Sequence, residues 1–204
     1  MTTWPTGLLT LAGVAGAVVA LVRLHLIERS LPVLGAAVSE YGVSSNPGGY
    51  RVATILLGTA GLSAAAGLRL AAVPRASGTS LVLLLVFGVL RLAISWVPMD
   101  PPGTRRTPRG VAHNLMAIAT FSCVAAAACT VGLSPAGTAA GGWFPTLAAW
   151  SGTGMSVCGG ALAATAVSRR ARRLFGLFER LLYLGIIVWL VVVGLRLIVS
   201  TTSW

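Results

Sequence analysis

The amino-acid sequence predicts an all-α integral membrane protein, folded as a single domain over residues 1–204 into a compact bundle of six transmembrane helices. Hydrophobic residues make up 56% of the chain and charged residues only 9%, and the mean hydropathy is +0.88. A chain with so few charges cannot cover a soluble globule with a polar surface. Its apolar residues also gather in segments of about 20, the length that crosses the hydrocarbon core of a bilayer as a helix.

Six such segments follow one another along the chain, at residues 7–27, 49–72, 79–97, 112–133, 144–167 and 177–200. The first runs into polar residues 23–29 instead of a small-residue cleavage site, so we expect a helix and not a signal peptide. The second follows Asn46-Pro47, a favourable helix start because Asn can cap free N–H groups and Pro lacks one. The fourth and fifth are rich in Ala and Gly, and we expect them at the centre of the bundle.

The distribution of arginine predicts the orientation of the bundle. All 15 basic residues are Arg, and most of those near loops lie beside the first, third and fifth loop: Arg29, Arg51, Arg105, Arg106, Arg109, Arg169, Arg170, Arg172 and Arg173. The opposite side has Arg69 and Arg75, so the positive-inside rule places loops one, three and five in the cytoplasm and both termini outside. Trp4, Trp143 and Trp204 agree, since they fall at the proposed outer interface. We expect these Arg to contact anionic lipid and not nucleic acid.

On this topology, every acid and histidine of the chain falls on the cytoplasmic side. These residues are Glu28, Glu40, Asp100, Glu179, His25 and His113. The acids can balance the cytoplasmic Arg, or they can line a functional site, and the sequence leaves both interpretations open. It also leaves open whether His25 and Glu28 belong to such a site.

Arg91 is the most informative charge, because it lies inside an apolar segment. It precedes Val97 by six residues, which places it about 9 Å into the membrane at 1.5 Å per helical residue. A charge at that depth needs a partner, and the candidates are Asp100, Glu40, Glu179 or an anionic ligand. Glu179 and Tyr183 are four apart and share one helix face.

Several familiar chemistries have no support in the sequence. His-x-x-x-His and Glu-x-x-His pairs are absent, so we expect no metal site, and two histidines on one side do not favour bis-histidine haem ligation. The sequence has no phosphate-binding Gly loop, no Gly-x-Ser-x-Gly elbow and no Asp-rich motif that could hold magnesium against a diphosphate. We therefore expect no cofactor.

Three short motifs resemble those of a known family. They are Ser39-Glu40-Tyr41, Val97-Pro98-Met99-Asp100-Pro101 running toward Gly110-Val111-Ala112-His113-Asn114, and Gly176-Leu177-Phe178-Glu179-Arg180. Over nearly the whole chain, the sequence resembles the bacterial membrane family known as domain of unknown function 998. The resemblance implies a compact multi-helix membrane protein, expected in the bacterial cytoplasmic membrane, and no established reaction. No second histidine lies near His113, which argues further against a metal.

The favoured function is an enzyme acting on a lipid or isoprenoid at the cytoplasmic leaflet, by acid-initiated cyclisation or isomerisation. A half-buried carboxylic acid can protonate an alkene or carbonyl, and aromatic rings can face the developing cation. The candidate catalytic residues are Asp100, Glu40, His113 and Glu179, with Asp100 or Glu40 as the acid. The candidate substrate-binding residues are Tyr41, Trp96 and Tyr183 in the pocket wall, Asn114 beside His113, and Arg91 or Arg180 as the anchor of an anionic headgroup.

Two other functions remain open, and the first of them uses the same residues. A small proton-coupled transporter or lipid-handling protein would place them along a pathway, although the outer half has few ionisable residues and no inverted repeat is visible. An accessory membrane protein would use the Arg-rich loops to bind anionic lipid or a partner. Membrane lipids are expected partners in each case, and the enzyme also requires a hydrophobic small-molecule or lipid substrate.

Overall fold

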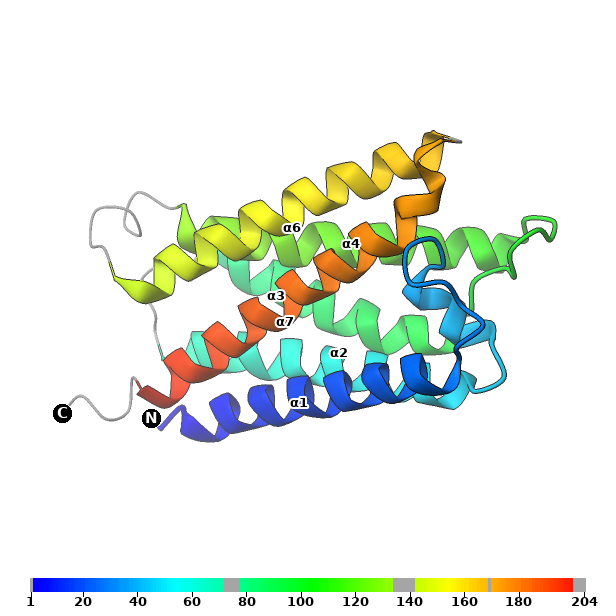
Figure 1. The fold of residues 1–204 in the computed structure, drawn as a ribbon. Coiled ribbons are helices and arrows are strands. Elements are labelled where there is room, and N and C mark those ends of the chain that lie inside the picture. The colour runs from blue at the N-terminus through cyan, green and yellow to red at the C-terminus, as the bar shows by residue number, and fades with distance from the viewer. Residues whose placement is uncertain (1, 72–77, 134–141, 169, 200–204) are drawn as a thin grey trace.

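The computed structural model describes residues 2–71, 78–133, 142–168 and 170–199, and these are almost entirely helical (Figure 1). The long helices are α1 Trp4–Ile27, α2 Pro47–Leu70, α3 Gly78–Ala93, α4 Pro108–Gly132, α6 Trp143–Val167 and α7 Phe175–Val199. Three short 3-10 helices lie between them: η1 Val38–Val43, η2 Ile94–Trp96 and η3 Ala171–Leu174. The predicted all-α bundle is confirmed.

The long helices form a closed ring. Each packs against the next along the chain, and α7 packs against α1 (Figure 1). A buried hydrogen bond of 2.9 Å from the Thr3 hydroxyl to the Leu197 carbonyl joins the start of α1 to the end of α7. Because α7 also contacts α2 and α4, the interior of the bundle lies along α7.

The expectation that the fourth and fifth segments lie at the centre is wrong. α4 and α6 do approach closely, since Gly132 lies against the backbone of Ala149 and Gly152 against Cys129. However, α2 and α7 contain more buried residues than α4 or α6. Small residues predicted the close contact, but close contact between two neighbours in a ring does not make either of them central.

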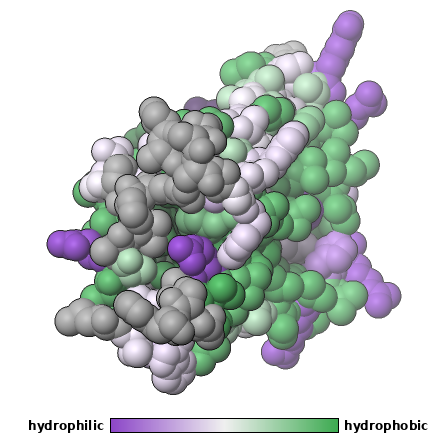
Figure 2. Space-filling model, turned by 90° about the vertical axis from the view of Figure 1, so that its left-hand side faces the viewer, coloured by the Kyte–Doolittle hydropathy of each residue, from purple (hydrophilic) through white to green (hydrophobic). Residues whose placement is uncertain are grey.

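Within the described ranges, five helical segments are long and apolar enough to cross a membrane: α1, α2, α3 with η2, α4, and η3 with α7. α6 has 25 residues and no charge, but its Gly, Ser and Thr residues make it less apolar. The chain is therefore a multi-pass membrane protein, and α6 is the predicted span that does not reach this level of hydropathy. Figure 2 shows hydrophobic surface on the flank of the bundle, viewed from the end where α1 begins and α7 ends.

The helix boundaries differ from the prediction around the third loop. α3 ends at Ala93 and α4 begins at Pro108, earlier than predicted. The Thr107 hydroxyl caps α4 by accepting a 3.1 Å hydrogen bond from the Gly110 N–H, and Pro108 occupies the first turn, where a missing N–H costs nothing. α2 begins at Pro47, as predicted, although the Asn46 side chain makes no capping bond.

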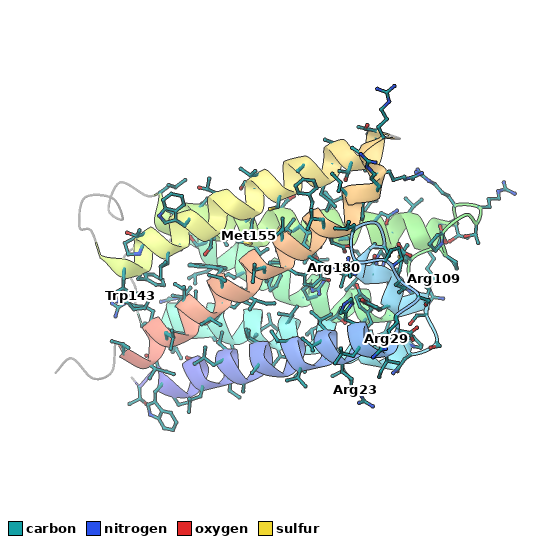
Figure 3. The ribbon with its side chains drawn as sticks, viewed as in Figure 1. Arg23, Arg29, Arg109, Trp143, Met155 and Arg180 are labelled. Carbon is teal, nitrogen blue, oxygen red and sulfur yellow. The ribbon has the colours of Figure 1, made fainter. Side chains whose placement is uncertain are left out.

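The segments that join α1 to α2, α3 to α4 and α6 to α7 lie at one end of the bundle, which we call the loop end (Figure 1). Arg23, Arg29, Arg109 and Arg180 lie toward this end, and Trp143 lies at the opposite end (Figure 3). Trp4, at the start of α1, and Trp143 therefore lie at the end opposite the basic loops, as predicted, and Trp96 lies at the loop end. Arg75, Arg169 and Trp204 lie outside the described residues. The side of the membrane that the loop end faces stays a prediction.

Candidate functional site

A polar cluster is buried inside the bundle, toward the loop end. Arg91 on α3 is 1% exposed. Its Nη2 donates to the Tyr183 hydroxyl on α7 at 2.8 Å, and its guanidinium carbon lies 5.0 Å from the centroid of the same ring, within cation–π range. Tyr50 on α2 is buried and interacts electrostatically with Tyr183 and Arg91, and Phe121 on α4 meets the Tyr183 ring edge to face. We call Arg91, Tyr183 and Tyr50 the Arg91 cluster.

Glu179 is the carboxyl that the fold places beside this cluster. It lies one turn before Tyr183 on α7, is buried, and interacts electrostatically with Arg91. Its Oε2 accepts a 2.6 Å hydrogen bond from the backbone N–H of Val38 in η1. Glu179 therefore links the Arg91 cluster to the first loop.

The first loop folds over the loop end at this point, and we call residues 31–45 the loop-one cap. Val38 contacts Glu179, and Gly42 lies against the Tyr50 ring. Arg180 on α7 holds the loop-one cap through Nη1, which donates to the carbonyls of Val33 at 2.7 Å and Ala36 at 2.8 Å. The chain segment that covers the cluster is thus fixed to α7 beside Glu179.

The remaining predicted residues of the first loop also stabilise the loop-one cap. The Tyr41 hydroxyl lies 3.2 Å from Nδ1 of His25 and accepts a 3.4 Å hydrogen bond from Nη2 of Arg180. Glu40 accepts a 2.7 Å hydrogen bond from the N–H of Ala37, within its own loop. Glu28 is buried and accepts hydrogen bonds from two hydroxyls of the loop-one cap, those of Ser44 and Ser45. His25 and Glu28 therefore anchor the loop-one cap on α1.

The residues predicted around the third loop make their hydrogen bonds outside the Arg91 cluster. Asp100 accepts hydrogen bonds from the N–H and the hydroxyl of Thr107, at 2.8 and 2.6 Å, and so supports the N-terminus of α4. His113 is buried, and its Nδ1 donates to the Val97 carbonyl at 2.6 Å. Trp96 is 55% exposed, and Asn114 is exposed. None of these hydrogen bonds reaches Arg91, Tyr183 or Tyr50, although His113 is close enough to Arg91 to interact with it electrostatically.

Asp100→Ala is expected to lower the thermal stability while lipid binding stays within about twofold of wild type, because the carboxylate bonds Thr107 and not the Arg91 cluster. These two hydrogen bonds hold the pKa of Asp100 below its usual range. A lowered folded pKa means that the stabilisation is present above the unfolded pKa of about 3.9 and is lost as the pH falls through the folded value. Thermal unfolding measured across acidic pH checks this. Lost lipid binding at unchanged stability would contradict it.

Sequence reasoning missed Tyr50 and Val38. Tyr50 stands one turn into α2, in a position where Tyr is also a common interface residue, so its type alone gave no signal. Val38 contributes only a backbone N–H, which no sequence pattern can reveal. Among the described residues, no group of three His, Cys, Asp or Glu side chains is placed to hold a metal ion.

A scan against profiles of protein families matches residues 11–196 to the family described as "Protein of unknown function (DUF998)". The match covers most of the chain and agrees with the resemblance carried by the short motifs. A search of curated proteins and a search of solved structures each find no significant match.

Proposed function

The chain belongs to the family of proteins of unknown function DUF998, whose description assigns no reaction, and we propose that it is a membrane-embedded enzyme acting on a lipid or isoprenoid. The proposed reaction is acid-initiated cyclisation or isomerisation, with Glu179 as the acid. The observation that carries the proposal is a buried carboxyl beside a buried Arg–Tyr–Tyr cluster on the inner face of α7. The loop end is proposed to face the cytoplasm.

Glu179 replaces Asp100 and Glu40 as the proposed acid because of what each carboxyl contacts. Asp100 is engaged by Thr107, and Glu40 by the backbone of its own loop. Glu179 shares a helix face with Tyr183 and lies inside the bundle. An ionisable group in a membrane interior is costly and commonly marks a functional site.

The proposed step is balanced in atoms and charge. The protonated Glu179 carboxyl gives its proton to a substrate alkene, which forms a new C–H bond and a carbocation. In an isomerisation, a neighbouring C–H bond then breaks and its electron pair forms a new alkene. In a cyclisation, a second alkene first attacks the cation to form a ring, and a C–H bond beside the new cation breaks afterwards. In both cases the released proton returns to the Glu179 carboxylate. The product is an isomer of the substrate. The rings of Tyr183 and Phe121 can face the cation.

A one-sided site supports an enzyme over a transporter. The buried ionisable side chains Glu28, Arg91, His113 and Glu179 lie toward the loop end of their helices. A transporter needs a polar pathway to both faces of the membrane. A lipid reaching the site from one leaflet needs only that the loop-one cap moves or that two helices separate.

Solvent isotope labelling tests the proposal. Purified protein in D2O is incubated with candidate isoprenoid and quinone lipids. The products are separated by chromatography, and their masses are measured by mass spectrometry. An isomer heavier by one deuterium is expected, because the proton that Glu179 donates exchanges with solvent. Absence of any isomeric product, together with substrate accumulation in proteoliposomes, would overturn the enzyme in favour of a transporter.

The proposed orientation has its own test. Arg105→Cys, in a background without the native cysteines, is expected to react with a membrane-impermeant maleimide only after the cells are opened. Reaction in intact cells would reverse the topology without changing the chemistry proposed for Glu179.

A further inference from the structure

We propose that the Arg91 cluster binds the headgroup of an anionic lipid, a phosphate or a carboxylate, and that this lipid is the substrate. The inference rests on the proposed function for the step that follows binding, but binding itself can be measured without turnover. The argument depends on the hydrogen-bond donors of the cluster, on its charge and on the difference between Arg91 and Arg180.

The Arg91 cluster has more donors than acceptors. A guanidinium carries five N–H donors and no acceptor, and each tyrosine hydroxyl adds one donor. Within the cluster, the acceptors are the two phenol oxygens. Arg91 Nη2 uses the Tyr183 oxygen, and Arg91 Nε is buried with no hydrogen-bond partner among the residues that the structure describes. A buried unpaired donor on a charged group is costly, so a ligand with anionic oxygens would complete the site.

The charge of Arg91 points to the same ligand. Its hydrogen-bond partner, Tyr183, is neutral. Glu179 interacts with Arg91 electrostatically, but its Oε2 is held by the N–H of Val38. The proposed reaction makes a negative charge near Arg91 still more favourable. A protonated Glu179 no longer balances the charge of Arg91, and a carbocation would form near the guanidinium. An anionic headgroup on Arg91 removes that repulsion.

Arg180 differs from Arg91 because both of its terminal nitrogens already donate hydrogen bonds within the protein. Its Nη1 donates to the carbonyls of Val33, Ala36 and Gly176, and its Nη2 donates to Tyr41. Arg180 is also only partly buried. Of the two arginines that the sequence offers as headgroup anchors, the contacts favour Arg91 and make Arg180 a fixed part of the loop-one cap.

Binding of three lipids with the same acyl chain tests the inference. Oleoyl lysophosphatidic acid, oleate and mono-oleoylglycerol present a phosphate, a carboxylate and a neutral headgroup, and each is titrated against the full-length protein in neutral detergent by native mass spectrometry. We expect at least one anionic lipid to bind about tenfold or more tightly than the neutral one. The ranking of phosphate and carboxylate identifies the headgroup. Equal binding of all three lipids would overturn the inference.

Variants locate the site. Arg91→Gln should abolish the preference for anionic lipid, and Arg105→Gln, which removes one charge from the exposed third loop, should leave it unchanged. Tyr50→Phe removes only a hydroxyl and should weaken anionic binding about three- to tenfold. If Arg91→Gln is misfolded, as judged by size-exclusion chromatography, Tyr50→Phe becomes the deciding variant. Unchanged binding of the anionic lipid by Tyr50→Phe would then contradict the inference.

Glu179→Gln separates the two proposals. It should keep the preference for anionic lipid, because the Arg91 donors remain. Preserved preference without any isomerisation by the wild type would reject the proposed function alone. Isomerisation of neutral lipid with no role for Arg91 would reject the headgroup site alone.

Discussion

Glu179→Gln is expected to lower isomer formation by about 10²–10⁴-fold, the usual contribution of a general acid. Glutamine has nearly the shape of glutamate, and its amide oxygen can still accept the hydrogen bond from Val38. It cannot release a carboxyl proton to an alkene. The fold should persist while the reaction is lost, and deuterium incorporation from D2O measures the loss directly.

Glu40→Gln is the matched control, since it changes another glutamate of the loop end from acid to amide. Glu40 contacts the N–H of Ala37, and the glutamine oxygen can take over that bond. Isomer formation in Glu40→Gln should therefore stay close to wild type. Full activity in Glu179→Gln combined with loss in Glu40→Gln would move the acid from α7 to the first loop.

Gly132→Ala is expected to destabilise the protein by about 3 kcal/mol, the upper end of the usual cost of overpacking. A Cβ at this position would overlap the backbone nitrogen of Ala149 on α6. Because the obstacle is backbone and not a flexible side chain, α4 and α6 must move apart to relieve it. Thermal unfolding of the purified protein in detergent measures the effect.

Gly154→Ala provides the control for this substitution. Gly154 is also a helical glycine, on α6, but no atom of the described part of the chain lies within 4 Å of a Cβ built there. Alanine is a better helix former than glycine by about 1 kcal/mol, so this variant should be as stable as wild type or slightly more stable. Equal destabilisation by both substitutions would show that the α4–α6 contact is not the cause.

The sequence was sufficient to predict the helical bundle because hydropathy over 20 residues depends on composition and not on distant contacts. It also identified Arg91 and Glu179, since a charge inside an apolar segment stands out wherever the helix packs. Sequence reasoning did not show that Asp100, expected as the acid, bonds Thr107 and supports the start of α4 instead. Thr107-Pro108 is the same kind of helix start as Asn46-Pro47, so the sequence does contain a signal for this contact.

The loop-one cap was beyond sequence reasoning for a different reason. Its position depends on bonds between residues far apart in the chain, such as Arg180 with Val33 and Ala36. The donors meet backbone carbonyls, which every residue has. Residue types therefore showed that polar groups gather at one end, but not which of them bind each other and which remain available for a ligand.

The bond between Arg91 and Tyr183 has a consequence for biogenesis. The two residues are 92 positions apart, and a chain is synthesised from its N-terminus. α3 is therefore complete, and its guanidinium must be accommodated in or near lipid, well before α7 leaves the ribosome. A charge in lipid is costly, so a nascent chain that ends before α7 carries a defect that the finished chain does not. Insertion of the last helix is the step at which that defect disappears.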